Sequence, residues 1–308
     1  EKSVILIGER AAEVPGLLST LAAHTTAKLA WIPRRSGEPG ALAVGAIGNL
    51  LPAGRPVDDA AARIDVASVW GVSSLPTTPG RSTSEILTSL NTEDGLEAVL
   101  IGGVDPADIS ADALNQLLNT FVVSLEISHS SVTAIADVVL PVAAVVEKSG
   151  GFVDWQGSVR PFEKAIEDAV PRSDVKILSS LADAMGTPIN LPSVSATARE
   201  INALGNLDGT KAIFDSVPSS NLNSEIELTS WRQLLDLGSL QEGEANLAGT
   251  ARKSVVHISA GRASQLGVNT GDSVRISSDL GSITLPVEIS EMADNRVWVP
   301  RNSINSQV

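Results

Sequence analysis

Two short glycine-containing stretches hold the residues best suited to chemistry. In the first, residues 147–151 read EKSGG, so an acid and a base stand directly before two adjacent glycines. Adjacent glycines allow a tight reversal of the chain or a close approach of its backbone to a ligand. Phe152, Asp154 and Trp155 follow, which adds two rings and a carboxylate. The residue types alone favour a structural turn with both rings in the core over a ligand site.

The second stretch, residues 102–106, reads GGVDP and follows the apolar run of residues 98–101. Such a run predicts a buried strand, and the ligands of open α/β sheets bind at the carboxyl ends of strands. Two hypotheses stay open here, a ligand contact and a structural turn. We favour the structural turn, because a fold can be kept when its site is lost.

The sequence offers little for metal or redox chemistry. It contains no cysteine, which excludes disulfides, cysteine-ligated iron–sulfur clusters and a cysteine-ligated molybdenum within these residues. The three histidines, His24, His129 and His257, lie far apart, and none has the spacing of metal ligands. Each is expected to be a surface residue or a locally hydrogen-bonded one. We therefore predict no catalytic residue and no metal site.

Charge and hydropathy narrow the classes of partner. The formal net charge is −14 and the isoelectric point is about 4.6, which opposes binding to nucleic acid or to an anionic membrane. No apolar run approaches the roughly 20 residues that span a bilayer, so direct membrane insertion is not expected. With 43% hydrophobic and 19% charged residues, the composition is typical of a soluble globular protein.

Alternating strands and helices must position both stretches. A strand at residues 3–7, a helix at 15–23 and a strand at 28–32 form a βαβ unit, which requires a parallel sheet. Residues 8–10 lack a GxGxxG loop and are interpreted as a strand end. Further strands are predicted at residues 98–101, 121–125 and 137–140. We therefore predict an α/β domain with a Rossmann-like parallel sheet over residues 1–224, the last part being a polar linker.

Two helices of this domain carry start signals. Asp58 or Asp59 precedes a helix that runs to Trp70, and acidic residues are favoured at such a position. Ser82 with Glu85 three residues later forms a capping box for a second helix. Residues 34–57, before the first of these helices, are rich in glycine and proline and are predicted to form a long irregular loop.

The last part of the chain changes to short alternating strands. The segments 254–258, 272–276, 283–289 and 297–299 alternate or continue this pattern, with glycine turns between them. This spacing is typical of a compact barrel. We predict a β-barrel domain over residues 225–308.

The region around the first stretch resembles a known family. ADVVLP at residues 136–141, followed by EKxGxFxxxxGxxR at 147–160, is similar to a signature of the molybdopterin oxidoreductase superfamily. The PF of residues 161–162 and the segment 34–57 resemble one branch of it, the large iron–sulfur subunit of bacterial NADH:quinone oxidoreductase (complex I), above all in actinobacteria. Residues 257–290 resemble the C-terminal double-psi β-barrel of the superfamily.

The resemblance implies a Rossmann-like domain followed by a double-psi β-barrel, which in molybdenum enzymes help to bind pterin guanine dinucleotides. Gly151, Asp154 and Ser158 stand where Thr, Asn and Arg often stand, and the start of the barrel offers only Arg232 beside Asp236. We therefore expect the fold to be retained and the cofactor lost. The vestigial cofactor-binding positions are then Gly102, Gly103, Asp105, Glu147, Lys148, Gly150 and Asp154.

The resemblance also implies a function. The chain would be the structural C-terminal portion of the large iron–sulfur subunit, supporting electron transfer from NADH to quinone by clusters in a missing N-terminal region. Its partners would be the other peripheral-arm subunits of complex I, on the cytoplasmic side of the plasma membrane. The alternative is a fragment of a molybdopterin-dependent oxidoreductase, such as a formate dehydrogenase, that binds a pterin guanine dinucleotide. A third hypothesis is a free-standing nucleotide-binding module, against which the absent glycine loop argues.

Overall fold

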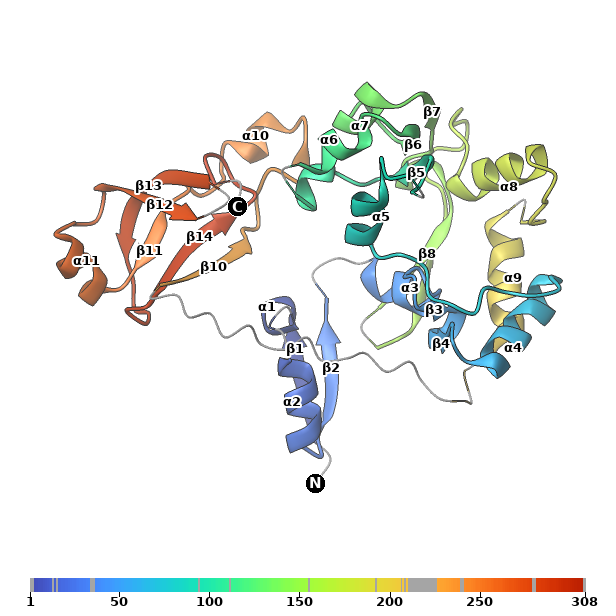
Figure 1. Ribbon diagram of the computed structural model, residues 1–308, viewed down its shortest axis with the longest axis horizontal. Coiled ribbons are helices and arrows are strands. Elements are labelled where there is room, and N and C mark those ends of the chain that lie inside the picture. Colours follow the sequence, from blue (N-terminus) through green and yellow to red (C-terminus); the bar gives the residue numbers. More distant parts are fainter. Residues whose placement is uncertain are drawn as a thin grey trace. The chain divides into compact units, whose positions relative to one another are not determined.

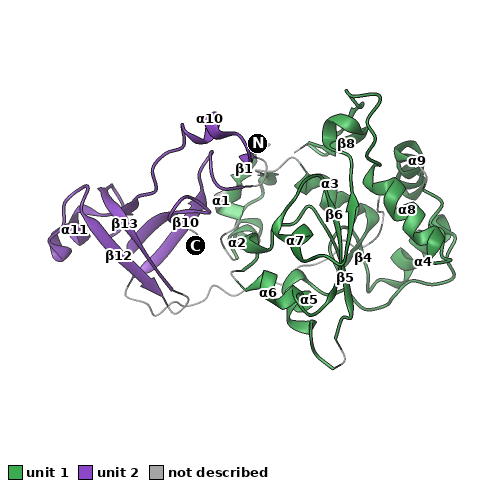
Figure 2. Ribbon diagram, turned by 90° about the horizontal axis from the view of Figure 1, so that it is seen from above, with its two compact units in different colours: residues 1–217 green, residues 218–308 purple. Residues whose placement is uncertain are grey.

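The chain forms two compact units, residues 1–217 and residues 218–308, which are described separately (Figure 2). The computed structural model describes all residues except 1–2, 13, 15, 34–36, 94, 111, 155, 192, 206, 208, 210–225, 239–240, 279–280 and 307–308. The predicted domain boundary between residues 224 and 225 lies outside the described residues, so it stays a prediction. Within the described ranges, no helix combines the length and the apolar character needed to cross a membrane.

The first unit opens with a parallel pair of strands. β1 (Val4–Gly8) pairs with β2 (Lys28–Ile32), and α1 (Glu9–Ala12) and α2 (Leu17–His24) lie between them in sequence. Parallel strands cannot be joined by a tight hairpin, so the helical connection follows from the strand direction. The predicted succession of strand, helix and strand is confirmed.

A second parallel sheet carries one of the two predicted site stretches. It consists of β5 (Ala98–Gly102), β6 (Phe121–Glu126) and β7 (Val138–Pro141), in that spatial order (Figure 1). Glu126 lies opposite Pro141 in the register of β6 and β7. Because the strands are parallel, their carboxyl ends share one edge of the sheet, and the GGVDP stretch begins at that edge.

Three short helices pack on one face of this sheet. They are α5 (Thr83–Ser89), α6 (Ala113–Leu117) and α7 (Ser131–Ile135). Both halves of the predicted capping box of α5 are present: the Ser82 N–H donates to Glu85 over 2.7 Å, and the Glu85 N–H donates to Ser82 Oγ over 3.4 Å. The helices and the sheet share a core of Leu90, Leu117, Val122 and Val132.

The glycine- and proline-rich segment contains short elements from residue 37 onward. α3 (Glu38–Ala43) is followed by β3 (Leu50–Leu51), the 3₁₀ turn η1 (Pro52–Gly54) and β4 (Arg55–Pro56), and β3 pairs antiparallel with β4. Gly45 has a φ of 72°, a left-handed backbone conformation that favours glycine. The prediction of one long irregular loop is therefore wrong in part, because a short helix and a pair of short strands form within it.

Arg55 ties this segment to the neighbouring helix α4 and to the distant helix α9. Its side chain is buried, and Nη2 donates over 2.9 Å to the carbonyl of Leu204, the last residue of α9 (Val194–Leu204). Its Nε lies 3.7 Å from the carboxylate of Asp65 in α4 (Ala60–Trp70). A buried guanidinium is tolerated because the Asp65 carboxylate offsets its charge and the carbonyls of Pro52 and Leu204 accept from its Nη atoms, although Nε itself has no hydrogen-bond partner among the described residues.

The predicted EKSGG stretch runs into a two-stranded antiparallel hairpin. β8 (Gly150–Val153) pairs with β9 (Val159–Phe162), and α8 (Asp174–Ala184) follows. The Phe152 ring stacks on the Phe162 ring with centroids 5.2 Å apart, yet Phe152 is 36% exposed. The prediction that Phe152 is a core ring is therefore wrong, because the ring finds its partner across the hairpin instead. Trp155 lies outside the described residues.

The second unit is a five-stranded mixed sheet with two short helices, α10 (Ala245–Ala248) and α11 (Ala260–Leu266). In spatial order its strands are β10 (Glu227–Arg232), β14 (Arg296–Arg301), β11 (Val256–Ile258), β13 (Gly281–Ile289) and β12 (Ser273–Ser278). β10 runs parallel to β14 and β11 runs parallel to β13, whereas β11 and β14 are antiparallel. The four strands predicted from alternation are confirmed, and closure into a double-psi barrel stays a prediction.

The core of the second unit comes from the faces of these strands and from α11. Its buried residues are Val256, Ile258, Ala263, Leu285, Val287, Val297 and Val299. Because β-branched residues pack well on a pleated surface, this composition suits a small sheet.

Candidate functional site

The carboxyl edge of the β5–β6–β7 sheet brings three predicted site residues together. Gly102 ends β5, and Gly103 follows with a φ of 64°, which favours glycine. The Asp105 carboxylate accepts from the Ala107 N–H over 3.0 Å and so caps the turn η2 (Pro106–Asp108). The Asp105 carboxylate therefore stabilises the turn that it begins.

Glu126, at the carboxyl end of β6, is a member of this edge that the sequence patterns did not single out. Burial raises the pKa of Glu126, the backbone N–H of Gly103 lowers it to a smaller extent, and the nearby Asp105 charge raises it further. The available signal was a charged residue placed directly after a buried strand.

Glu147 and Lys148 both make contacts within the chain. Glu147 Oε2 accepts from the Ala144 N–H over 2.8 Å and closes the 3₁₀ turn η3 (Val145–Glu147). The Lys148 ammonium pairs with the carboxylate of Asp174, the first residue of α8. Sequence spacing gave no signal for this pair, because its members are 26 residues apart. The charge of Lys148 is compensated inside the chain.

The packing of the hairpin explains why residue 150 is a glycine. A Cβ atom at this position would lie 2.8 Å from Cζ of the Phe162 ring. That separation is shorter than carbon atoms tolerate, so a side chain at this position would displace the ring from β8. Glycine at position 150 thus allows the close approach of the Phe162 ring and not of a ligand.

Asp154 organises the loop between β8 and β9. Its half-buried carboxylate accepts from the N–H groups of Gln156 and Ser158 over 3.0 and 2.9 Å, and from Arg160 Nε over 2.8 Å. These bonds, with the one from Ser158 first, lower the pKa of Asp154. Asp154 is therefore not a bare negative charge in this loop, because the loop donors and Arg160 compensate it.

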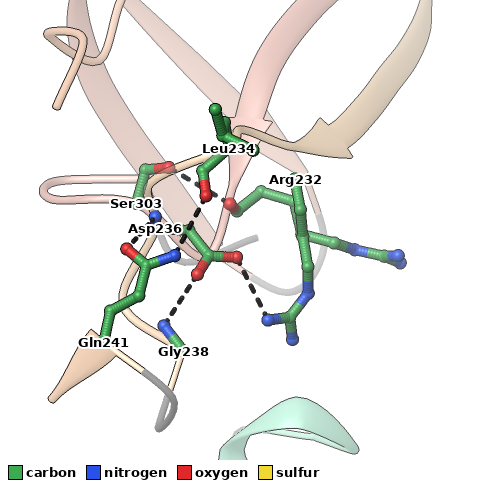
Figure 3. Close-up of polar contacts among 7 residues, drawn as sticks. Arg232, Leu234, Asp236, Gly238, Gln241 and Ser303 are labelled. Atoms are coloured by element: carbon green, nitrogen blue, oxygen red, sulfur yellow. Dashed lines mark hydrogen bonds and ion pairs between the residues drawn. The ribbon is translucent and has the colours of Figure 1, made fainter. Parts of the chain in front are cut away.

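The start of the second unit contains a closely packed polar cluster after β10 (Figure 3). Arg232 and Asp236 form an ion pair with Nη1 and Oδ2 3.2 Å apart, and their side chains are only 15% and 5% exposed. The Gly238 N–H donates to Asp236 Oδ1 over 2.9 Å. Gln241 bridges the turn, because its Oε1 accepts from the Asp236 N–H and its Nε2 donates to the Leu234 carbonyl.

His257 makes a local contact, as the sequence predicts. Its Nδ1 lies 2.6 Å from Ser290 Oγ, and its ring meets the edge of Trp298 at a centroid distance of 4.8 Å. Among the residues that the structure describes, no three side chains of His, Cys, Asp or Glu come together as a metal site.

The predicted positions fall into two groups. Gly102, Gly103 and Asp105 share the sheet edge, whereas the positions from residue 147 to residue 154 lie in η3, in the hairpin and in its loop. The polar contacts described above stay within one group or the other. In each group the donors described here meet a carboxylate of this chain, so the contacts compensate charge within the chain.

Both units match models of known protein families. A protein-family model described as molybdopterin oxidoreductase matches residues 3–184, and one described as molydopterin dinucleotide binding domain matches residues 226–307. The NADH-quinone oxidoreductase G subunit of Mycobacterium bovis is 46% identical over 99% of this chain, and that of Streptomyces coelicolor is 42% identical over 100%.

More distant relatives cover less of the chain. Formate dehydrogenase H of Escherichia coli is 32% identical over 49% of this chain and 22% of its own length. Acetylene hydratase from Pelobacter acetylenicus has a solved structure that matches 78% of this chain and 42% of its own, with a TM-score of 0.51 and 15% identity, a likeness of fold. The chain spans 40% and 38% of the length of the Mycobacterium and Streptomyces relatives.

Proposed function

The chain belongs to the molybdopterin oxidoreductase family, and from that membership we propose that it forms the C-terminal part of the G subunit, the large iron–sulfur subunit, of a bacterial NADH-quinone oxidoreductase. The observation that carries this proposal is the extent of the similarity. Identity of 42–46% runs along 99–100% of the chain for the Mycobacterium and Streptomyces relatives, compared with 32% along 49% for the formate dehydrogenase.

In this proposal the chain supports electron transfer from NADH to quinone without performing it. These residues include no cysteine, so cysteine-ligated clusters would belong to an N-terminal region of the longer subunit. The chain would be part of an enzyme and carry no catalytic residue of its own. Its partners would be the other peripheral-arm subunits, on the cytoplasmic side of the plasma membrane.

The family implies a pterin guanine dinucleotide, and the contacts of this chain do not fit one. A pyrophosphate group needs several N–H donors and positive charges. Lys148 pairs with Asp174, and Arg232 pairs with Asp236. We therefore propose that the positions matching the cofactor loops are vestigial and that the chain binds no pterin.

The proposal includes a finer architecture. Residues 1–224 would form the Rossmann-like domain with its linker, and residues 225–308 the double-psi barrel. The parallel pairing of β1 with β2 and of β5, β6 and β7 supports the first assignment. The mixed five-stranded sheet, within the segment matched by the dinucleotide-binding model, supports the second.

A chimaeric subunit tests the proposed function. The region of the Streptomyces coelicolor relative that matches this chain is replaced by these 308 residues, and membranes are assayed for NADH-dependent quinone reduction. We expect activity comparable to that of the parent strain, with deletion of the same region as the inactive control. An immunoblot of the membranes establishes that the chimaera accumulates.

Two results would contradict the proposal. A chimaera that accumulates in the complex and restores no NADH-dependent quinone reduction would show that the chain cannot serve as this part of the subunit. Molybdenum and pterin in stoichiometric amounts in the purified chain would favour the alternative, a fragment of a molybdopterin-dependent oxidoreductase such as a formate dehydrogenase.

A further inference from the structure

The turn after β10 holds the Asp236 carboxylate as a protein holds a bound anion. A guanidinium donates to one carboxylate oxygen and a backbone N–H to the other, from Arg232 and Gly238 respectively (Figure 3). Guanidinium groups and backbone N–H groups in turns are the donors that proteins use for phosphates and carboxylates. Only 5% of the Asp236 side chain is exposed, so water does little to solvate this carboxylate.

The backbone of the turn is shaped to bring its N–H close to the anion. A Cβ atom on residue 238 would lie 2.8 Å from Asp236 Oδ1, so a side chain at this position would displace the carboxylate from its present place. Gln241 fixes the turn from the other side, since it accepts from the Asp236 N–H over 3.2 Å and donates to the Leu234 carbonyl over 3.0 Å. The donors are therefore held in place by the turn itself.

We propose that the Asp236 carboxylate is an internal ligand, filling an anion-binding site that Arg232 and the Gly238 N–H would otherwise offer to a phosphate group. This inference rests on the proposed function, because a chain that holds no dinucleotide needs another negative charge beside a nearly buried guanidinium. The ion pair with Asp236 compensates the charge of the nearly buried guanidinium, so the internal carboxylate takes over the neutralising role of a phosphate.

The second unit contains a matched pair without these features. Arg296 Nη1 lies 2.6 Å from Glu227 Oε1, but the two side chains are 41% and 32% exposed. Water solvates both partners there, and such pairs contribute little to stability or to anion affinity. Replacement of Glu227 is therefore the control for replacement of Asp236.

Inorganic pyrophosphate is the probe, because it carries the charge of a dinucleotide without its bases. The 308-residue chain with Asp236→Ala is titrated with pyrophosphate at constant ionic strength, by calorimetry and by thermal unfolding. We expect saturable binding heat and a rise in Tm of about 2–4 °C at several times the Kd. The wild-type chain and Glu227→Ala should show neither. Asp236→Ser, whose shorter side chain also vacates the position of the carboxylate, should show the same gain if Asp236→Ala fails to fold.

The outcomes separate this inference from the proposed function. If a folded Asp236 variant gains no pyrophosphate binding while the wild type also binds none, the internal-ligand inference is wrong and the cofactor-free function stands. If the wild-type chain itself binds pyrophosphate, the site is open, and both the inference and the absence of a cofactor are contradicted. Adding Arg232→Met to Asp236→Ala should abolish the gained binding; binding that persists would place the anion elsewhere and overturn the assignment.

Discussion

At the scale of single residues, Gly150 and Glu126 show two different constraints on the candidate site. Gly150 leaves room for the Phe162 ring, which a Cβ atom would approach to 2.8 Å. Glu126 keeps a carboxyl group at a partly buried sheet edge, where burial raises its pKa. The first constraint is steric and independent of pH, whereas the second is electrostatic and changes with pH.

Gly150→Ala should destabilise the chain. The added methyl group must displace the Phe162 ring, and overpacking of this kind typically costs about 1–3 kcal/mol in the free energy of unfolding. Chemical denaturation of both proteins measures the loss. Gly8→Ala is the matched control, because no atom lies within 4 Å of a Cβ at that position. Equal stabilities for Gly150→Ala and the wild type would mean that the ring is not held against β8.

Glu126→Gln should raise the Tm at pH 7. Because the folded chain raises the pKa above the ordinary value of 4.5, the folded state binds the proton more tightly than the unfolded state. The free energy of unfolding therefore falls as the pH rises from 4.5 through the raised pKa. A neutral glutamine avoids this loss, so its advantage should be full above that window and absent below pH 4.5.

Glu85→Gln is the control of opposite sign. The Ser82 N–H bond lowers the pKa of Glu85, so its carboxylate favours the folded state above the ordinary value of 4.5. Removing that charge should lower the Tm at pH 7, and the difference should vanish as the pH falls through the lowered pKa. If the Tm difference from the wild type changed with pH in the same direction for Glu126→Gln and Glu85→Gln, the opposite pKa shifts assigned to the two residues would be refuted.

At the scale of elements, short helices of the first unit depend on the residues that begin them. Ser82 caps α5, Ser130 caps α7 and Asp59 caps α4, each by accepting from a backbone N–H of the first turn. Helices of five to eleven residues are too short to be stable alone, so capping and packing must supply the difference.

Asp59→Ala should lower the free energy of unfolding by about 0.5–2 kcal/mol, because the Ala61 N–H then loses its acceptor. That N–H donates to Asp59 Oδ1 over 2.8 Å. Urea denaturation measures the change, and Asp59→Ser should recover most of it. The neighbouring exposed Asp58 provides the control, since Asp58→Ala should leave stability nearly unchanged. If Asp58→Ala lowered the free energy of unfolding by the same amount, the assignment of Asp59 as the N-cap would be wrong.

Local elements could be predicted from the sequence and their distant partners could not. The strands of both units and the capping box of Ser82 and Glu85 follow from patterns within a few residues. The pair of Lys148 with Asp174 and the bond of Arg55 to Leu204 depend on where separate elements meet in space. Spacing therefore named Lys148 as a candidate but could not show that its charge is compensated.

At the scale of the whole molecule, each unit has its own hydrophobic core. All seven buried members of the second core lie between residues 256 and 299, and the first core is built from residues 90–132. A core contributed by one continuous segment lets that segment fold by itself. We therefore expect each unit to have a free energy of unfolding of its own.

Residues 226–308 expressed alone should unfold in one cooperative thermal transition, followed by circular dichroism. Val299→Ala, at a fully buried core position, should lower the Tm of this fragment, because a cavity replaces the lost methyl groups. The exposed Ser273 lies outside this core, and Ser273→Ala should have little effect. A gradual loss of signal without a transition would mean that the second unit needs the first.

The bond between Arg55 and Leu204 also bears on how the chain matures on the ribosome. Its partners are 149 residues apart, so at 5–20 residues per second Leu204 is synthesised about 7–30 s after Arg55. Until then the guanidinium lacks its α9 acceptor and is better left in water than buried. The folded loop of residues 50–56 would therefore settle after α9 emerges, and a ribosome stalled before residue 194 should carry a nascent chain in which Arg55 is still hydrated.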